Sequence, residues 1–167
     1  MDGATESPGT GARSDAAATP ARPPLLATLL DAAAAVLALV GVADSVYLTV
    51  EHLLGNTVRC TVTSGCSEVL GSPYASLWGV PLAAFGAAAY FTAFSLATLS
   101  AFGYTKARTL LTVLVAAMFA TTLWLLYVQA FVLEAFCQYC LLSAAVTTLL
   151  AVIVLVQRLT RPKGFQV

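Results

Sequence analysis

The sequence predicts an all-α membrane protein, a bundle of four transmembrane helices with an external loop that carries a short interfacial helix. Hydrophobic residues make up 59% of the 167 residues, only 10% are charged, and the mean hydropathy is +0.87, whereas soluble domains are nearer one quarter charged. Four apolar segments each reach the roughly 20 residues that a helix needs to cross the hydrocarbon core of a bilayer. Membrane lipid is therefore an expected partner, and nucleic acid is not.

The chain divides into a tail, a membrane domain and a second tail. Residues 1–24 contain mainly Ala, Gly, Pro, Ser and Thr, which is typical of a disordered cytoplasmic tail. A membrane domain is expected over residues 25–157 and a cytoplasmic tail over 158–167, with helices near 25–54, 79–102, 108–133 and 138–157. A signal peptide cleaved after Ala43 is disfavoured, because the apolar run exceeds the roughly 7–15 residues of such signals and a long tail precedes it.

Lysine and arginine residues predict the orientation. Seven of the eight lie in three places that a four-helix path brings to one side: Arg13, Arg22, Lys106, Arg108, Arg158, Arg161 and Lys163. The opposite side, with the loop 55–78 and the turn 134–137, carries only Arg59. Because positive charge marks the cytoplasmic side, we expect both termini in the cytoplasm and both connections outside.

The four cysteines form two pairs along the chain. Cys60 and Cys66 lie in the first external loop, and Cys137 and Cys140 form a CxxC motif at the head of the last apolar segment. Residues i and i+3 share a helical face, close enough for a strained, reducible disulfide. A helix beginning here lowers the pKa of the Cys137 thiol, whereas Glu134 opposes this, so the net shift stays open. Both pairs lie outside, where disulfides persist, so they can meet.

The external loop has further features that predict local structure. Arg59 is expected to favour a thiolate at Cys60. Tyr74, Leu77 and Trp78 suit a short amphipathic segment at the membrane interface. Pro81 suits the first turn of the second membrane helix, where its missing N–H costs nothing.

Together these residues resemble the vitamin K epoxide reductase family, in its bacterial disulfide-forming branch. The matching features are Ser45-Val46-Tyr47, His52, Cys60, Gly65-Cys66, the run Ser72-Pro73-Tyr74 through Gly79-Val80-Pro81, and Phe136-Cys137-Gln138-Tyr139-Cys140. The order of loop pair, serine and then CxxC is specific. It differs from the Dsb-type inner-membrane oxidase, in which the CxxC comes in the first external loop.

The resemblance implies a quinone-linked thiol oxidoreductase of the bacterial cytoplasmic membrane, with its active site on the external face. A thioredoxin-like, DsbA-type protein would reduce a Cys60–Cys66 disulfide, and Cys66 would then attack Cys137. Cys140 would pass the electrons to menaquinone or ubiquinone beside Ser72. Because the chain ends at Val167 without a fused thioredoxin-like domain, this partner is expected to act in trans.

Several ionisable or aromatic residues are weaker candidates for the quinone pocket. Asp44 lies deep in the first helix, where an ionisable group is costly. It either relays protons to the quinone or packs as a neutral residue that hydrogen-bonds Ser45 or Tyr47. Tyr139 is expected at the interface, and contact with the quinone stays open. Asp31, nearer the cytoplasmic end, is expected to reach water.

Three alternative interpretations remain. The first is a vitamin K epoxide reductase; animal members have Thr-Tyr-Ala after the CxxC, and Ser143-Ala144-Ala145 stands here instead, which argues against it. The second is a structural four-helix membrane protein held by two disulfides. The third, a four-thiolate zinc or copper site, requires reduced thiols and is disfavoured on an oxidising side, so no metal is expected.

Overall fold

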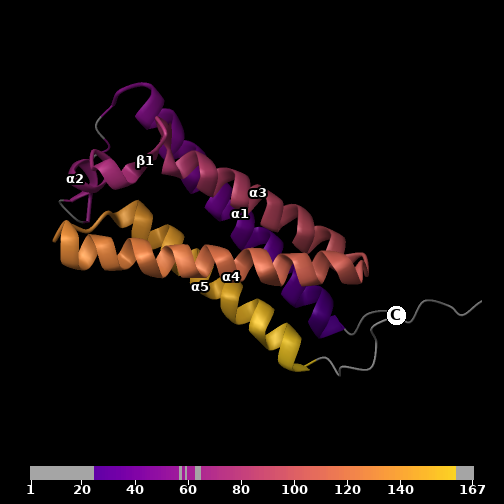
Figure 1. The fold of residues 1–167 in the computed structure, drawn as a ribbon. Coiled ribbons are helices and arrows are strands. Elements are labelled where there is room, and N and C mark those ends of the chain that lie inside the picture. Colours follow the sequence, from indigo (N-terminus) through magenta and orange to yellow (C-terminus); the bar gives the residue numbers. More distant parts are fainter. Residues whose placement is uncertain (1–24, 57, 59, 63–64, 161–167) are drawn as a thin grey trace, which may run out of the picture.

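The computed structural model confirms an all-α membrane bundle (Figure 1). It describes residues 25–56, 58, 60–62 and 65–160, so the expectations for residues 1–24, for residues 161–167 and for Arg59 lie outside the described residues. Residues 158–160 of the expected second tail are the last turn of the final helix. Four helices of the described chain are long and apolar enough to cross a membrane. They are α1 (Leu25–Leu53), α3 (Leu82–Ala101), α4 (Thr105–Tyr127) and α5 (Gln138–Thr160).

The connection between α1 and α3 folds as three short elements. A five-residue helix, α2 (Cys66–Leu70), is followed by a 3-10 turn, η1 (Pro73–Ala75). A two-residue hairpin then pairs β1 (Ser76–Leu77) with β2 (Val80–Pro81), with Leu77 opposite Val80. The short helix of the loop is therefore α2, and the segment from Tyr74 to Trp78 is a turn and a strand.

The hairpin turn explains why the expected segment is not helical. Trp78 and Gly79 both have positive φ angles, 52° and 80°, as the two central residues of a type I′ turn require. The turn leaves the Trp78 side chain 92% exposed, as suits an aromatic residue at a membrane surface. Pro81 ends the hairpin and is the N-cap of α3, one residue before the position expected for it.

The bundle packs through small residues and presents large ones outward. Ala34 and Ala38 of α1 belong to one buried cluster with Ala93 and Ala97 of α3, and such small residues let helices approach closely. At Gly41 the approach is closest, because a methyl group there would overlap the ring of Tyr90. Large apolar side chains such as Leu29, Trp124 and Phe131 face outward, as in helices that are surrounded by lipid.

Asp31 is buried, and the expectation that it reaches water is wrong. Its side chain is 2% exposed. Its Oδ1 accepts hydrogen bonds from Ser100 Oγ of α3 at 3.1 Å and from Gln157 Nε2 of α5 at 2.9 Å. Arg108 Nε of α4 donates to the same Ser100 oxygen at 3.3 Å. All four helices meet in this polar cluster, so the carboxyl group is satisfied inside the bundle.

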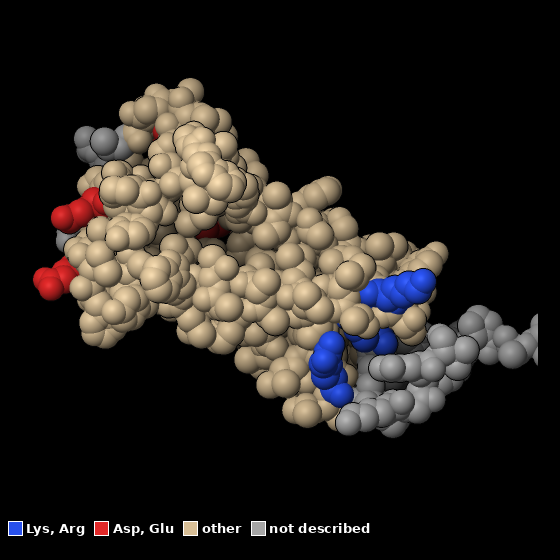
Figure 2. Space-filling model, in the orientation of Figure 1, with Lys and Arg blue, Asp and Glu red and all other residues tan. Residues whose placement is uncertain are grey.

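The two ends of the bundle differ in charge and in structure. The start of α1, the α3–α4 turn and the end of α5 lie at one end, and the loop with α2 lies at the other (Figure 1). Figure 2 shows the described lysine and arginine residues at the first end and acidic residues at the loop end. The described basic residues are Lys106, Arg108 and Arg158.

Candidate redox site

The CxxC motif forms the N-terminus of α5. The backbone N–H of Leu141 donates to the Cys137 carbonyl oxygen at 3.0 Å, so Cys137 caps the helix and Cys140 lies in its first turn. A hydrogen bond from the Cys140 thiol, supported by the backbone N–H groups of Tyr139 and Cys140, lowers the pKa of Cys137 to about 7, although burial and the charge of Asp44 oppose this. The hydrogen bond from Cys140, with the backbone N–H groups of the helix start, thus makes Cys137 an acidic thiol, which settles a net shift that the sequence left open.

The segment before the CxxC is bent into place by an irregular end of α4. Five residues, η2 (Val128–Val132), form a π-helical turn, and Glu134 follows in the left-handed region with φ 49°. The buried Gln129 fastens the returning chain, because its backbone oxygen accepts from Ala135 N and its Oε1 accepts from Cys137 N, both at 3.1 Å. Isolated π-turns occur frequently at functional sites, and this one positions Cys137.

The loop pair is joined and lies directly over the CxxC. Cys60 and Cys66 form a disulfide, and Cys137 and Cys140 are free thiols. Gln138, inside the motif, binds the loop: its Oε1 accepts from Thr61 N at 3.0 Å, Val62 N at 2.9 Å and Thr61 Oγ1 at 3.2 Å.

The two pairs meet in one buried cluster. Cys66 and Cys137 are 1% and 0% exposed and pack with Val69 and Ala135, and Cys60 and Cys140 lie against this cluster. Gly65 permits the contact, because a Cβ added there would lie 2.8 Å from the backbone nitrogen of Phe136. Only glycine lets the loop come this close to the CxxC.

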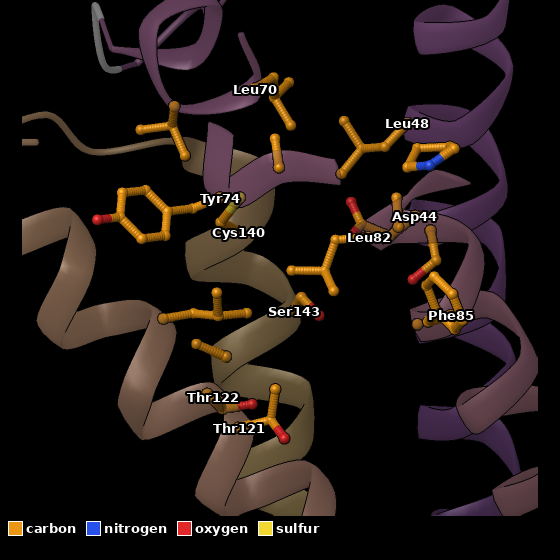
Figure 3. Close-up of a pocket in the computed structure, with 18 of the residues that line it drawn as sticks. Asp44, Leu48, Leu70, Tyr74, Leu82, Phe85, Thr121, Thr122, Cys140 and Ser143 are labelled. Carbon is orange, nitrogen blue, oxygen red and sulfur yellow. The ribbon is translucent and has the colours of Figure 1, made fainter. Parts of the chain in front are cut away.

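A cavity of about 600 Å³ opens on the other side of Cys140 (Figure 3). All four long helices and the loop contribute to its wall, which is mostly apolar, with Leu48, Leu82, Phe85 and Met118 among its lining. Figure 3 shows Cys140 and Ser143 of α5 on one side and Asp44 of α1 across from them. Apolar cavities of this size with a few polar groups are typical of sites for small organic ligands.

Of the other predicted site residues, Ser72 and Asp44 line the cavity and Tyr139 does not. Ser72 lines the cavity, but its hydroxyl donates to the Val69 carbonyl at 2.7 Å, so its hydrogen is engaged. Asp44 lines the cavity, and its Oδ2 has no hydrogen-bond partner within the described chain, which disfavours the hydrogen-bonded packing role. Tyr139 does not belong to the described cavity wall and packs on Tyr47, with ring centroids 5.4 Å apart.

Three residues of the site were not singled out from the sequence. Gln129 is a polar residue within an apolar segment. Because an unpaired amide is costly in a membrane, its position in the sequence could have indicated a buried hydrogen-bonding role. Gln138 lies within the CxxC itself, although nothing in its spacing indicates that it binds the loop. Tyr90 carries a buried hydroxyl that hydrogen-bonds Ser143 Oγ at 2.8 Å and Thr147 Oγ1 at 2.7 Å in the cavity wall.

The fold and the site define a class of protein: a multi-pass membrane protein in which two cysteine pairs meet beside an apolar cavity. The model of the vitamin K epoxide reductase family matches residues 32–155. The chain belongs to this family. A comparison with curated proteins gave no match. Family membership indicates a membrane thiol oxidoreductase, and enzymes of this family use quinones.

Proposed function

We propose that this protein is a quinone-dependent thiol oxidase that forms disulfides on the external side of a bacterial cytoplasmic membrane. The observation that carries the proposal is the position of Cys137. It lies in the buried cluster with Cys66 and forms a hydrogen bond with Cys140, which lines the cavity. A chain of four sulfur atoms thereby runs from the exterior loop to the place where an electron acceptor would bind.

The steps balance in electrons and protons. A reduced, thioredoxin-like partner gives two electrons to the Cys60–Cys66 disulfide and leaves with its own disulfide. The Cys66 thiolate then attacks Cys137 in an oxidised Cys137–Cys140 pair and releases the Cys140 thiolate. Cys60 attacks Cys66 of this mixed disulfide, which restores the loop disulfide and releases Cys137 as a thiolate, so the two electrons now lie on the CxxC pair. The arrangement with a loop disulfide and a CxxC dithiol is the state of the cycle that follows this transfer.

The cavity suits a quinone by size and by chemistry. A quinone ring needs apolar walls, a redox group in contact with it, and donors for its two carbonyl oxygens. Cys140 would supply the contact, and Asp44, Ser143 and Ser72 are polar groups in the same wall. When bound, the quinone accepts the two electrons of the CxxC dithiol, and either menaquinone or ubiquinone has the necessary ring.

Charge supports the proposed orientation. Lys106, Arg108 and Arg158 lie at the end opposite the cysteines (Figure 2), and the cytoplasmic side of membrane proteins carries the excess of positive charge. Both termini would then be cytoplasmic, and the loop disulfide would face an oxidising exterior. A thioredoxin-like domain of the DsbA type is the partner that we propose for such a site.

The test follows quinone absorbance in purified, detergent-solubilised protein that is given a reduced thioredoxin-like substrate. Wild type should convert menaquinone or ubiquinone to the quinol. Cys140→Ser should still exchange thiols through the loop pair but should leave the quinone unchanged. Thr92→Ala, on the exposed side of α3 where Oγ1 only donates to the Ala88 carbonyl, is a control for purification and should match wild type.

Two outcomes would contradict the proposal. Full quinone turnover by Cys140→Ser would remove Cys140 from the terminal step. An unchanged quinone band in wild type, with the quinone shown to be bound and the thiol substrate shown to be accepted, would favour the structural role of the disulfides. A parallel sample that is given a naphthoquinone epoxide distinguishes the thiol oxidase from an epoxide reductase, because only an epoxide reductase would consume the epoxide.

A further inference from the structure

Two buried carboxyl groups lie on α1, and they differ in their partners. Asp31 is satisfied by Ser100 and Gln157. Asp44 is 9% exposed, it lines the cavity, and its buried Oδ2 has no hydrogen-bond partner among the described residues. Nearly all buried polar atoms in folded proteins are paired, so the unpaired oxygen of Asp44 is free to bind a ligand in the cavity.

The burial of this carboxyl group favours its protonated form. An ionised carboxylate without a partner is costly in an apolar environment, and an ionisable residue within a membrane helix is by default a functional candidate. Figure 3 shows the carboxyl group of Asp44 on the cavity side of α1, across from Cys140 and Ser143 of α5. A ligand bound between these helices would therefore lie between the acid and the thiol.

The other titratable groups of the cavity are engaged or exposed. They are His52 of α1, Tyr74 of the loop, Tyr90 of α3 and Cys140 of α5, and the described lining of α4 has none. The Tyr90 hydroxyl is bound to Ser143 and Thr147, and the Cys140 thiol is bound to Cys137. His52 and Tyr74 are exposed. Among the described residues of this cavity wall, Asp44 is a buried acid, and its Oδ2 has no hydrogen-bond partner.

We propose that Asp44 gives a proton to a carbonyl oxygen of the bound quinone while the CxxC dithiol supplies the electrons. This inference rests on the proposed function. Two S–H bonds break and one S–S bond forms between Cys137 and Cys140. The quinone gains two electrons and two O–H bonds: one proton comes from Asp44 and one from the thiol pair. The second thiol proton returns to the Asp44 carboxylate, so the acid is restored in each turnover.

The same carboxyl group affects the dithiol through its charge. An ionised Asp44 opposes the lowering of the Cys137 pKa, because two negative charges repel each other. A protonated Asp44 therefore allows the Cys137 thiolate to form before the electrons leave. Once the sulfur atoms have become a neutral disulfide, the repulsion between Asp44 and the Cys137 thiolate is gone, and the acid can release its proton at the stage when the quinone oxygen needs it.

The experiment compares Asp44→Asn with Asp31→Asn, the same substitution of a second buried carboxyl on the same helix. The two positions are 13 residues apart, about 20 Å along the helix axis. Asp44→Asn should lower kcat for quinone reduction by about 10²–10⁴-fold, the range of general acid catalysis, and should leave the KM for quinone nearly unchanged. Thiol exchange from the loop pair to the CxxC, measured in a single turnover without quinone, should keep its wild-type rate.

A spectroscopic measurement on quinone-free protein reports the acid directly. The infrared band of a protonated carboxyl group should be present in wild type and in Asp31→Asn, and absent in Asp44→Asn. Asp44→Glu keeps the acid on a longer side chain, so it should retain the band and regain part of the activity. This variant also shows whether the position tolerates substitution.

The outcomes separate this inference from the proposed function. If wild type reduces quinone and Asp44→Asn keeps kcat within threefold, the role of Asp44 is refuted while the thiol oxidase stands. Loss of the thiol exchange step in Asp44→Asn would also overturn it, since the substitution would then act on the cysteines. If wild type itself does not reduce quinone, the proposed function fails, and the role of Asp44 fails with it.

Discussion

The contact between Gln138 and the loop gives the sharpest quantitative prediction. In Gln138→Ala, three hydrogen bonds to Thr61 and Val62 disappear. Each bond of this kind contributes about 0.5–1.5 kcal/mol, and because these donors are exposed we take the lower half of that range. The docked loop should therefore lose about 1.5–3 kcal/mol. At about 1.4 kcal/mol per tenfold change, the equilibrium constant for opening of the loop rises roughly 10- to 100-fold.

Amide hydrogen exchange measures this opening directly. The Thr61 and Val62 amides should exchange about 10–100 times faster in Gln138→Ala than in wild type, because each exchanges only when its hydrogen bond to Oε1 is broken. Gln138→Glu is the matched control: its carboxylate still accepts these bonds, and bonds to an ionised acceptor are stronger. Its exchange should be equal or slower. Rates in Gln138→Ala within twofold of wild type would show that the loop docks without this side chain.

Three further predictions concern the thiol, the loop contact and the polar cluster. The ultraviolet absorbance of the Cys137 thiolate, which is read without a reagent entering the buried site, should rise with pH through about 7. Cys140→Ala should move the midpoint upward because the hydrogen bond that lowers the Cys137 pKa is lost, and an unmoved midpoint would contradict this. Gly65→Ala places a methyl group 2.8 Å from the backbone nitrogen of Phe136. Single-turnover electron transfer between the loop cysteines and the CxxC cysteines should therefore slow at least tenfold, and a wild-type rate would refute the close contact. Asp31→Leu leaves two buried donors unpaired and should lower the free energy of unfolding, measured by denaturant titration in detergent, by about 2–4 kcal/mol. Leu29→Ala is the control, because Leu29 is 66% exposed on the same helix, and it should change this free energy by less than about 0.5 kcal/mol.

The sequence was sufficient to predict the features that depend on composition and spacing. Apolar length alone marks the four membrane helices, because a bilayer imposes one thickness on every span. Four membrane crossings bring the first and third connections to the same end of the bundle, so both cysteine pairs are expected at that end. These properties need no knowledge of which side chains touch. The CxxC at a helix start indicated two opposing influences on the Cys137 pKa and left the net shift open; the structure lowers that pKa to about 7, chiefly through the hydrogen bond from Cys140.

The features that were not predicted depend on packing between distant segments. Asp31 was expected in water because its position in α1 is near a helix end, yet Ser100 and Gln157, 69 and 126 residues away, satisfy it inside the bundle. The π-turn before the CxxC leaves no sequence pattern. The Ser72 hydroxyl was expected to face a ligand and instead donates to the Val69 carbonyl, because a short turn places that acceptor three residues back.

The unequal surroundings of the two CxxC sulfur atoms favour the direction of the proposed relay. Cys137 caps α5, where free backbone N–H groups stabilise a thiolate, and it shares a buried cluster with Cys66. Cys140, one turn further along the helix, lines the cavity. In thiol exchange with the loop, the loop thiolate would therefore attack the Cys137 sulfur, and the Cys140 sulfur, which faces the cavity, would be the leaving group. In the proposed relay a partner would meet the loop disulfide first, since Cys66 and Cys137 are almost completely buried.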